Sequence, residues 1–297
     1  MADKGMSLAL PKHVEAQLPL PQGQRIGRVS EVHRDRITVQ TDGPDVAVTP
    51  GSGRSSGDVA VGDWVAFDPV DRVLRDILER RTALRRKAAG EAVAEQLIAA
   101  NIDTLFIVTS CNADFNVARL ERYLALAASS DIMPVIVLTK ADLCDDPNTY
   151  RRTAERLSPL ATAVSVNALD PQSLSQLDPW LRAGETGALV GSSGVGKSTI
   201  LNLLTDAAGL TQGIREDDAK GRHTTTARSL KQTRTGGWLI DTPGIRQLAL
   251  VDGGDAIDKV FSDISDLVDQ CRFSECQHET EPGCAVLAAV EAGTLDS

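Results

Sequence analysis

An eight-residue segment reads Gly191-Ser192-Ser193-Gly194-Val195-Gly196-Lys197-Ser198 and matches the pattern G-x-x-x-x-G-K-[ST] at every fixed position. The apolar run 188–190 precedes it, and an apolar helical pattern over 200–204 follows it. Glycines allow the backbone to curl so that successive N–H groups point at one phosphate, and a helix N-terminus adds partial positive charge. The segment therefore predicts a phosphate-binding loop between a buried strand and a helix.

Side-chain chemistry assigns roles within this loop. We expect Lys197 to reach the β- and γ-phosphate oxygens of a nucleotide and Ser198 to ligate Mg²⁺. A glycine- and serine-rich turn without a ligand is the alternative, but the strand before it and the helix after it favour the phosphate loop. The nucleotide-binding residues expected here are Gly191, Ser192, Ser193, Gly194, Val195, Gly196, Lys197, Ser198 and Thr199.

A second segment indicates which base is bound. The residues Thr139-Lys140-Ala141-Asp142 end an apolar strand and resemble the guanine signature [NT]-K-x-D of GTPases. Guanine offers two adjacent donors, N1–H and the exocyclic amine, and an ionised Asp142 accepts both at once. We expect the Lys140 stem to pack on the base and Thr139, in place of the commoner Asn, to weaken a tie to the phosphate loop. Ser165 and Val166 are the expected last guanine-contact loop, with a plain turn as the alternative.

A third segment, Asp241-Thr242-Pro243-Gly244, follows the apolar run 238–240 and resembles the D-x-x-G element of GTPases. We expect Asp241 to hold Mg²⁺ through water and the Gly244 N–H to sense the γ-phosphate, so that the following loop is a switch. Each motif alone is common by chance. The three together, each at a strand end, predict a GTPase with GTP, GDP and Mg²⁺ as ligands.

The segment Gly221-Arg222-His223-Thr224-Thr225-Thr226 has the composition of a first switch. We expect Thr225 to complete Mg²⁺ coordination, with Thr224 or Thr226 as alternatives. Many GTPases place Gln after D-x-x-G to orient the attacking water, whereas this chain has Ile245, which forms no side-chain hydrogen bond. Intrinsic hydrolysis should therefore be slow, and His223 is the candidate water-positioning group, an exposed residue without a catalytic part being the alternative.

The order of the motifs differs from that of standard GTPases. In those enzymes the phosphate loop comes first and the guanine motif last, whereas here the guanine motif at 139–142 precedes the phosphate loop at 191–198. The D-x-x-G element at 241–244 comes last of the three. This order predicts a circularly permuted GTPase domain, whose second switch leads directly into the C-terminal segment.

The rest of the chain suggests flanking domains. Residues 1–24 read as a disordered tail, and 25–84 as short alternating strands of a small barrel, of which the oligonucleotide-binding (OB) type is one. Apolar runs at 104–108, 134–138, 188–190 and 238–240 predict strands of a parallel sheet, with helices over 117–127 and along a face through 93, 97 and 100. A helical period over 257–268 and a short helix at 285–290 follow.

Three cysteines and one histidine crowd into 14 residues near the C-terminus: Cys271, Cys276, His278 and Cys284. Three thiolates and one imidazole form the ligand set of a closed structural Zn²⁺ site, without an open position for catalysis. Buried thiols without metal are the alternative. Cys111 and Cys144 lie at strand ends and are interpreted as packing residues.

Composition limits the class of protein. The 297 residues are 42% apolar and carry a net charge of −10, which excludes a uniformly basic nucleic-acid coat. No apolar run approaches the ~18 residues of a membrane span, and no export signal is evident, so we expect a cytoplasmic protein without membrane contact. Arg80, Arg81, Arg85, Arg86 and Lys87 form either a phosphate-contacting strip or a plain solvated junction.

The motif order, the G-R-H-T-T-T switch and the Cys₃His cluster together resemble the bacterial circularly permuted, ribosome small-subunit-dependent GTPases of the RsgA (YjeQ) family. The likeness covers roughly residues 25–293 and includes the segments 62–65, 85–90 and 96–101. It implies a multidomain fold: an OB-type β-barrel at 25–84, an α/β P-loop GTPase domain at 85–252 and an α-helical zinc-binding domain at 253–297.

The same resemblance implies a function. Family members act in late maturation of the 30S ribosomal subunit, which stimulates their GTP hydrolysis, so 16S rRNA is the expected contact of a monomeric protein. They commonly continue past the short C-terminal helix, whereas this chain stops at Ser297, which leaves their C-terminal rRNA contact open here. The alternatives are a P-loop kinase or ATPase, a nucleotide-gated RNA-binding module, and a GTPase acting on another ribosomal particle.

Overall fold

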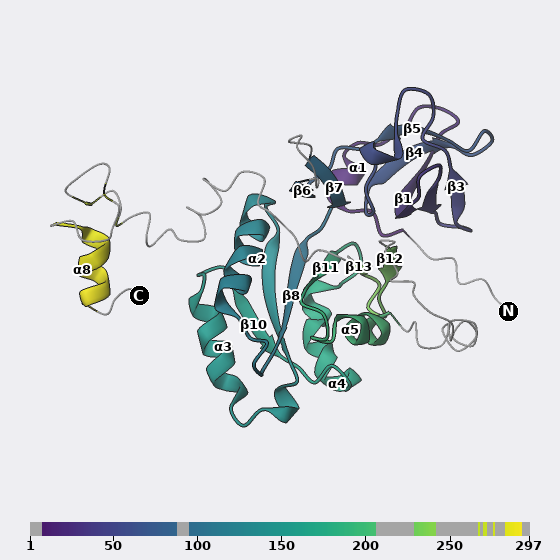
Figure 1. The fold of residues 1–297 in the computed structure, drawn as a ribbon. Coiled ribbons are helices and arrows are strands. Elements are labelled where there is room, and N and C mark those ends of the chain that lie inside the picture. Colours follow the sequence, from purple (N-terminus) through teal and green to yellow (C-terminus); the bar gives the residue numbers. More distant parts are fainter. Residues whose placement is uncertain are drawn as a thin grey trace.

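The computed structural model describes residues 8–87, 95–205, 229–241, 267, 270–271, 276 and 283–292. Within them, most strands join one mixed sheet in the order β10-β9-β8-β11-β13-β12-β1-β2-β3, with β4 and β5 attached at β1 (Figure 1). Its strands are β1 (Arg25–Val32), β2 (Ile37–Gln40), β3 (Val46–Val48), β4 (Trp64–Asp68), β5 (Val73–Ile77), β8 (Thr104–Ser110), β9 (Met133–Thr139), β10 (Thr162–Ser165), β11 (Thr186–Gly191), β12 (Ser229–Gln232) and β13 (Trp238–Asp241).

The strands β10, β9, β8, β11 and β13 are parallel neighbours, and β12 is antiparallel to β13. The helices α2 (Val117–Ser129) and α3 (Pro147–Arg156) lie on one face, while α4 (Pro171–Leu174) and α5 (Lys197–Leu204) lie on the other (Figure 1). Alternate residues of β8 enter different cores, Leu105 and Ile107 with α2, Phe106 and Val108 with α5. The predicted parallel sheet with two covered faces is confirmed.

The strands β1 to β5 form the N-terminal barrel around a separate core that includes Val29, Val39 and Phe67. β1 pairs with β2 and β4, β2 with β3, and β4 with β5. A parallel bridge between Thr49 and Val73 brings the end of β3 to β5 and completes the circuit. The sequence pattern predicts strands at 25–29, 36–41, 45–49 and 62–67, which correspond to β1 to β4. It misses β5, because Arg75 and Asp76 interrupt the apolar alternation of that strand.

Residues 8–24 correct the prediction of a disordered tail over 1–24. They contain the short helix α1 (Lys12–Glu15), whose Val14 is fully buried, and the Leu8 side chain is buried in the same core. Gln17 accepts a hydrogen bond from the Glu79 N–H, and Leu8 N–H donates to Asp42. The prolines of this segment suggested a disordered tail, but the segment is ordered and packs on the barrel.

A predicted helix along 93–100 is also wrong where the structure describes it. Residues 95–100 form strand β7 (Glu95–Ala100), which pairs antiparallel with β6 (Ala83–Lys87). Ile98, Ala99 and Ala100 are all buried. Three apolar positions in eight residues are compatible with the period of a helix and with that of a strand. Pairing with β6 makes this segment a strand.

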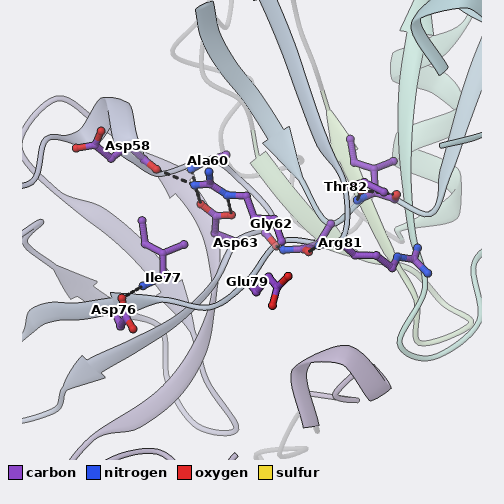
Figure 2. A network of polar contacts seen from close by, with 12 residues as sticks. Asp58, Ala60, Gly62, Asp63, Asp76, Ile77, Glu79, Arg81 and Thr82 are labelled. Carbon is purple, nitrogen blue, oxygen red and sulfur yellow. Dashed lines mark hydrogen bonds and ion pairs between the residues drawn. The ribbon is translucent and has the colours of Figure 1, made fainter. Parts of the chain in front are cut away.

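The junction between barrel and α/β sheet is held by charge pairs (Figure 2). Asp63, fully buried, accepts two 2.7 Å hydrogen bonds from the Arg80 guanidinium and one from the Ala60 N–H. Arg81 pairs with Asp103. Two residues of the predicted basic strip are therefore engaged within the protein, which argues against a free phosphate-contacting surface at those positions.

A buried arginine joins the two units. Arg28 of β1 is 1% exposed and lies between two indole rings, with its guanidinium carbon 5.1 Å from the Trp64 ring centre and 5.4 Å from that of Trp238. It donates a 2.6 Å hydrogen bond to Thr186 of β11. Burial lowers its pKa to about 9, so the guanidinium stays charged at neutral pH.

In the described part of the chain, no helix combines the length and apolar character needed to cross a bilayer.

Candidate functional site

The three nucleotide motifs meet at one edge of the sheet. In the strand register, Ser110 of β8 lies opposite Thr139, Val108 lies opposite Gly191, and Leu189 lies opposite Asp241. The guanine motif, the phosphate loop and the D-x-x-G aspartate thus leave the carboxyl ends of neighbouring parallel strands. Ligands of open α/β sheets bind at this edge.

The phosphate loop is closely fitted to its neighbouring strand. Gly191 has φ +138°, and a Cβ on it would lie 2.1 Å from the Val108 carbonyl oxygen, so only glycine fits. The Lys197 ammonium donates hydrogen bonds to the carbonyls of Gly191 (2.8 Å) and Ser192. These contacts hold the positive charge over the loop before a phosphate arrives. Arg119 of α2 contacts the Ser192 hydroxyl and supports the loop from the helix side.

Thr139 bonds the phosphate loop closely at the position where Thr in place of Asn predicts a weak tie. It is fully buried, and its hydroxyl lies 2.7 Å from the Val195 carbonyl and 3.1 Å from the Thr109 carbonyl. Val195 is a buried residue of the phosphate loop. The hydroxyl of Thr139 therefore joins the base-binding and phosphate-binding segments directly.

A cavity of about 250 Å³ opens between these segments. Its wall is shared by the phosphate loop, the guanine motif and the loop after β10. Lys140 stands at its edge in the left-handed conformation (φ 56°). Leu143 and Leu169 are 80% and 77% exposed, and offer apolar surface to a flat ring. The lining residues are Thr139, Lys140, Asp142, Leu143, Asn167, Ala168, Leu169, Gly194, Val195, Gly196 and Thr199.

After β10, the cavity is lined by residues that follow the predicted guanine-contact residues Ser165 and Val166. Ser165 ends β10, and Val166 is 1% exposed with its N–H bonded to the Leu138 carbonyl, so neither lines the cavity. The residues that do are Asn167, Ala168 and Leu169. Backbone pairing with β9 continues one residue past the end of β10, because the Val166 N–H donates to the Leu138 carbonyl. The feature of the sequence that could have indicated this lining is Leu169, an exposed leucine that follows the strand end.

Asp241 ends β13 beside two positive charges. Burial raises the pKa of its carboxyl, while Lys231 and Lys197 act in the opposite direction. The proximity of Asp241 to Lys197 fits a shared phosphate and Mg²⁺ site, since a cation there would replace the lost hydration of the carboxylate. The predicted switch residues His223, Thr225 and Gly244 lie outside the described residues.

The C-terminal cysteines come together as a metal site requires. The sulfurs of Cys271, Cys276 and Cys284 lie within 4.8 Å of one another, and those of Cys271 and Cys284 are 3.9 Å apart. Tetrahedral Zn–S bonds of about 2.3 Å place two thiolates roughly 3.8 Å apart. The cluster therefore fits zinc. Cys284 also caps α8 (Ala285–Glu291), accepting from the Leu287 N–H. His278, the predicted fourth ligand, lies outside the described residues.

Comparison with known proteins matches this arrangement to one family. The model of the RsgA GTPase family matches residues 77–251, more than half of the chain. The chain belongs to the RsgA GTPase family. A Mesorhizobium japonicum relative named small ribosomal subunit biogenesis GTPase RsgA is 51% identical over 275 residues, which cover 91% of this chain and 79% of that protein.

Two solved structures share the fold of this RsgA-family GTPase. The crystal structure of YjeQ from Thermotoga maritima aligns with a TM-score of 0.64 and 26% identity, covering 92% of this chain and 94% of that one. That of YloQ, titled a circularly permuted GTPase, aligns with a TM-score of 0.63 and 24% identity, covering 94% and 93%. The permuted order predicted from the motifs is confirmed. The enzyme hydrolyses GTP to GDP and uses Mg²⁺ as its family does.

Proposed function

We propose that this GTPase acts in maturation of the small ribosomal subunit, and that the subunit accelerates a slow intrinsic hydrolysis. The observation that carries the proposal is the joining of one nucleotide site to a barrel through a shared sheet, in a chain 51% identical to a relative named for small-subunit biogenesis. Such a subunit is found in the cytoplasm, where we place the protein.

The described residues support separate roles in binding the base, the phosphates and Mg²⁺. Asp142 accepts the two guanine donors, and the cavity wall formed by Lys140 and Leu169 holds the ring. Lys197 binds the β- and γ-phosphate oxygens from the position that its bonds to the loop carbonyls already give it. Ser198, Asp241 and Thr225 would hold Mg²⁺, which neutralises charge on the phosphates when bound.

Slow intrinsic turnover follows from the residue that comes after the D-x-x-G element in the sequence. Ile245 accepts no hydrogen bond, so the chain lacks a polar group at the position after D-x-x-G. In this proposal His223 positions the water only when the subunit orders the switch around it. Hydrolysis then loosens the switches and releases the protein.

The flanking units supply the RNA contacts in this proposal. We infer an OB-type barrel, a fold that binds oligonucleotides, and the strand circuit β1-β2-β3-β5-β4 supports this inference. We assign it to residues 25–84, the GTPase domain to 85–252 and the zinc domain to 253–297. The protein acts as a monomer on 16S rRNA.

The function is tested by measuring GTP and ATP hydrolysis with the protein alone, with 30S subunits and with 50S subunits. We expect slow GTP turnover that rises roughly 10²-fold or more with 30S, and no ATP turnover. Equal stimulation by 50S would assign another ribosomal particle. GTP turnover that neither particle changes would refute the proposed partner and retain the GTPase.

Zinc is tested by elemental analysis of the purified protein. We expect one Zn²⁺ per chain and its loss in Cys276→Ser, because three ligands hold structural zinc poorly. The variant should melt at a lower temperature, since the metal constrains the segment that ends in α8. Cys144→Ser is the matched control and should keep its zinc. Zinc retained in Cys276→Ser would refute the assigned ligand set.

A further inference from the structure

The loop that follows β8, residues 111–116, leaves the sheet between the segments that bind the base and the phosphates. β8 pairs on one side with β9, which leads into the guanine motif, and on the other side with β11, which leads into the phosphate loop. The carboxyl end of β8 therefore opens onto the nucleotide edge of the sheet. The three nucleotide motifs lie outside this loop, so its part in the site follows from its contacts.

Hydrogen bonds within the loop give it a defined shape. The Asn112 side-chain oxygen accepts a 2.8 Å bond from the hydroxyl of Ser110, a fully buried residue, and a 3.0 Å bond from the Asp114 N–H. The Phe115 ring packs edge-on against Tyr150 of α3, with 5.1 Å between the ring centres. These contacts fix Asp114 where the chain turns into α2.

Arg119, in the first turn of α2, is held both by its backbone and by its side chain. Asn116 caps the helix and accepts a 2.9 Å hydrogen bond from the Arg119 N–H. The guanidinium nitrogen Nη1 lies 3.3 Å from a carboxylate oxygen of Asp114, and the same nitrogen contacts the Ser192 hydroxyl of the phosphate loop. Arg119 thus links the loop after β8 to the phosphate loop through a single nitrogen.

Ser192 is also one of the two residues that hold the Lys197 ammonium. The Ser192 carbonyl, together with that of Gly191, accepts a hydrogen bond from Lys197. Two cations therefore hold the same residue, Arg119 by its hydroxyl and Lys197 by its carbonyl. A shift of Ser192 would move the Lys197 ammonium away from its place in the loop.

We propose that Arg119 is a positioning residue for GTP hydrolysis, which holds Ser192 and, through Ser192, the Lys197 ammonium where the phosphates require it. This inference rests on the proposed role of Lys197 in binding the β- and γ-phosphate oxygens. A preorganised charge acts on the transition state, so its misplacement lowers kcat more than it raises KM. We expect a loss of about tenfold in kcat, less than for removal of Lys197 itself, because Gly191 still holds the ammonium.

Single-turnover hydrolysis of saturating GTP by the full chain alone measures the chemical step. Arg119→Ala should slow it about tenfold, and Arg119→Lys should recover most of the rate, because an ammonium can replace a single donating nitrogen. Arg122→Ala removes the same charge from an exposed position of α2 and is the matched control, with the rate of wild type. A rate in Arg119→Ala equal to that of Arg122→Ala would overturn the proposal.

A double-mutant cycle tests whether Arg119 acts through Ser192. Ser192→Ala should slow the chemical step to a similar extent, and Arg119→Ala added to it should change the rate little further. A general loss of stability would instead make the two effects independent, and full additivity would overturn the route through Ser192. Ser192→Ala removes only a hydroxyl, so it also tests the contact in a variant whose helix α2 is unchanged.

Lys197→Ala is the reference that separates this inference from the function on which it rests. Adding Arg119→Ala to Lys197→Ala should slow hydrolysis no further, since the group to be positioned is then absent. If Lys197→Ala slows hydrolysis and Arg119→Ala does not, the inference fails while the assigned phosphate loop stands. Normal hydrolysis by Lys197→Ala refutes both. No ribosomal particle takes part in these measurements, so their outcome is independent of the proposed partner.

Discussion

Affinity for GTP should fall about a thousandfold in Asp142→Asn, and affinity for xanthosine triphosphate should rise. Asp142 lines the cavity beside Lys140 and is suited to accept both guanine donors. Each hydrogen bond to a charged group contributes about 1.5–3 kcal/mol, so losing the pair costs roughly 4 kcal/mol. Xanthine carries a carbonyl in place of the exocyclic amine, which the asparagine amide can meet with its own N–H. Nucleotide competition for a fluorescent GDP analogue measures both changes.

Asp145→Asn is the matched control for this exchange. It makes the same chemical change three residues further on, at an exposed side chain that does not line the cavity. Its GTP affinity should equal that of wild type. If Asp142→Asn kept its preference for GTP over xanthosine triphosphate, the base would have to be read by other groups, and the assigned orientation of the cavity would be wrong.

The rate of GTP hydrolysis should fall about 10²- to 10³-fold in Lys197→Ala. Lys197 is held over the phosphate loop by two carbonyls, so its charge is already in place when the phosphates enter. A preorganised donor of this kind stabilises charge that develops in the transition state, and alanine removes it without a substitute. Single-turnover measurements with 30S subunits present separate the chemical step from product release.

Thermal melting of the same variant shows whether the fold survives. The two bonds of the Lys197 ammonium are part-buried, so water can replace it and the melting temperature should change little. Lys12→Ala, an exposed lysine of α1 remote from the loop, controls for the loss of one positive charge. Normal hydrolysis by Lys197→Ala with 30S subunits would refute the assignment of the phosphate loop.

The sequence predicted those features of the fold that the local residue pattern and the side-chain chemistry determine together. The loop 191–198 requires glycines for close backbone approach, a lysine for charge and a helix behind it, so its residues leave few alternatives. The parallel strands were equally clear, because strands covered on both faces are continuously apolar. The structure bears out β8, β9, β11 and β13 close to their predicted limits.

The failures depended on partners distant in sequence. β7 is a strand because β6 lies beside it, and residues 8–24 are ordered because Val14 is buried in the core that also holds Trp64 and Leu105. Arg80 and Arg81 looked like a basic surface because nothing local predicts Asp63 or Asp103 opposite them.

The joining of barrel and nucleotide domain by paired strands has a mechanical consequence. β1 pairs with β12 at Glu31 and Ser229, β12 pairs with β13, and Arg28 fills the space between Trp64 and Trp238. Trp238 begins the strand that ends in Asp241. A pull or twist applied to the barrel is therefore transmitted through directly paired strands to the strand that ends in Asp241.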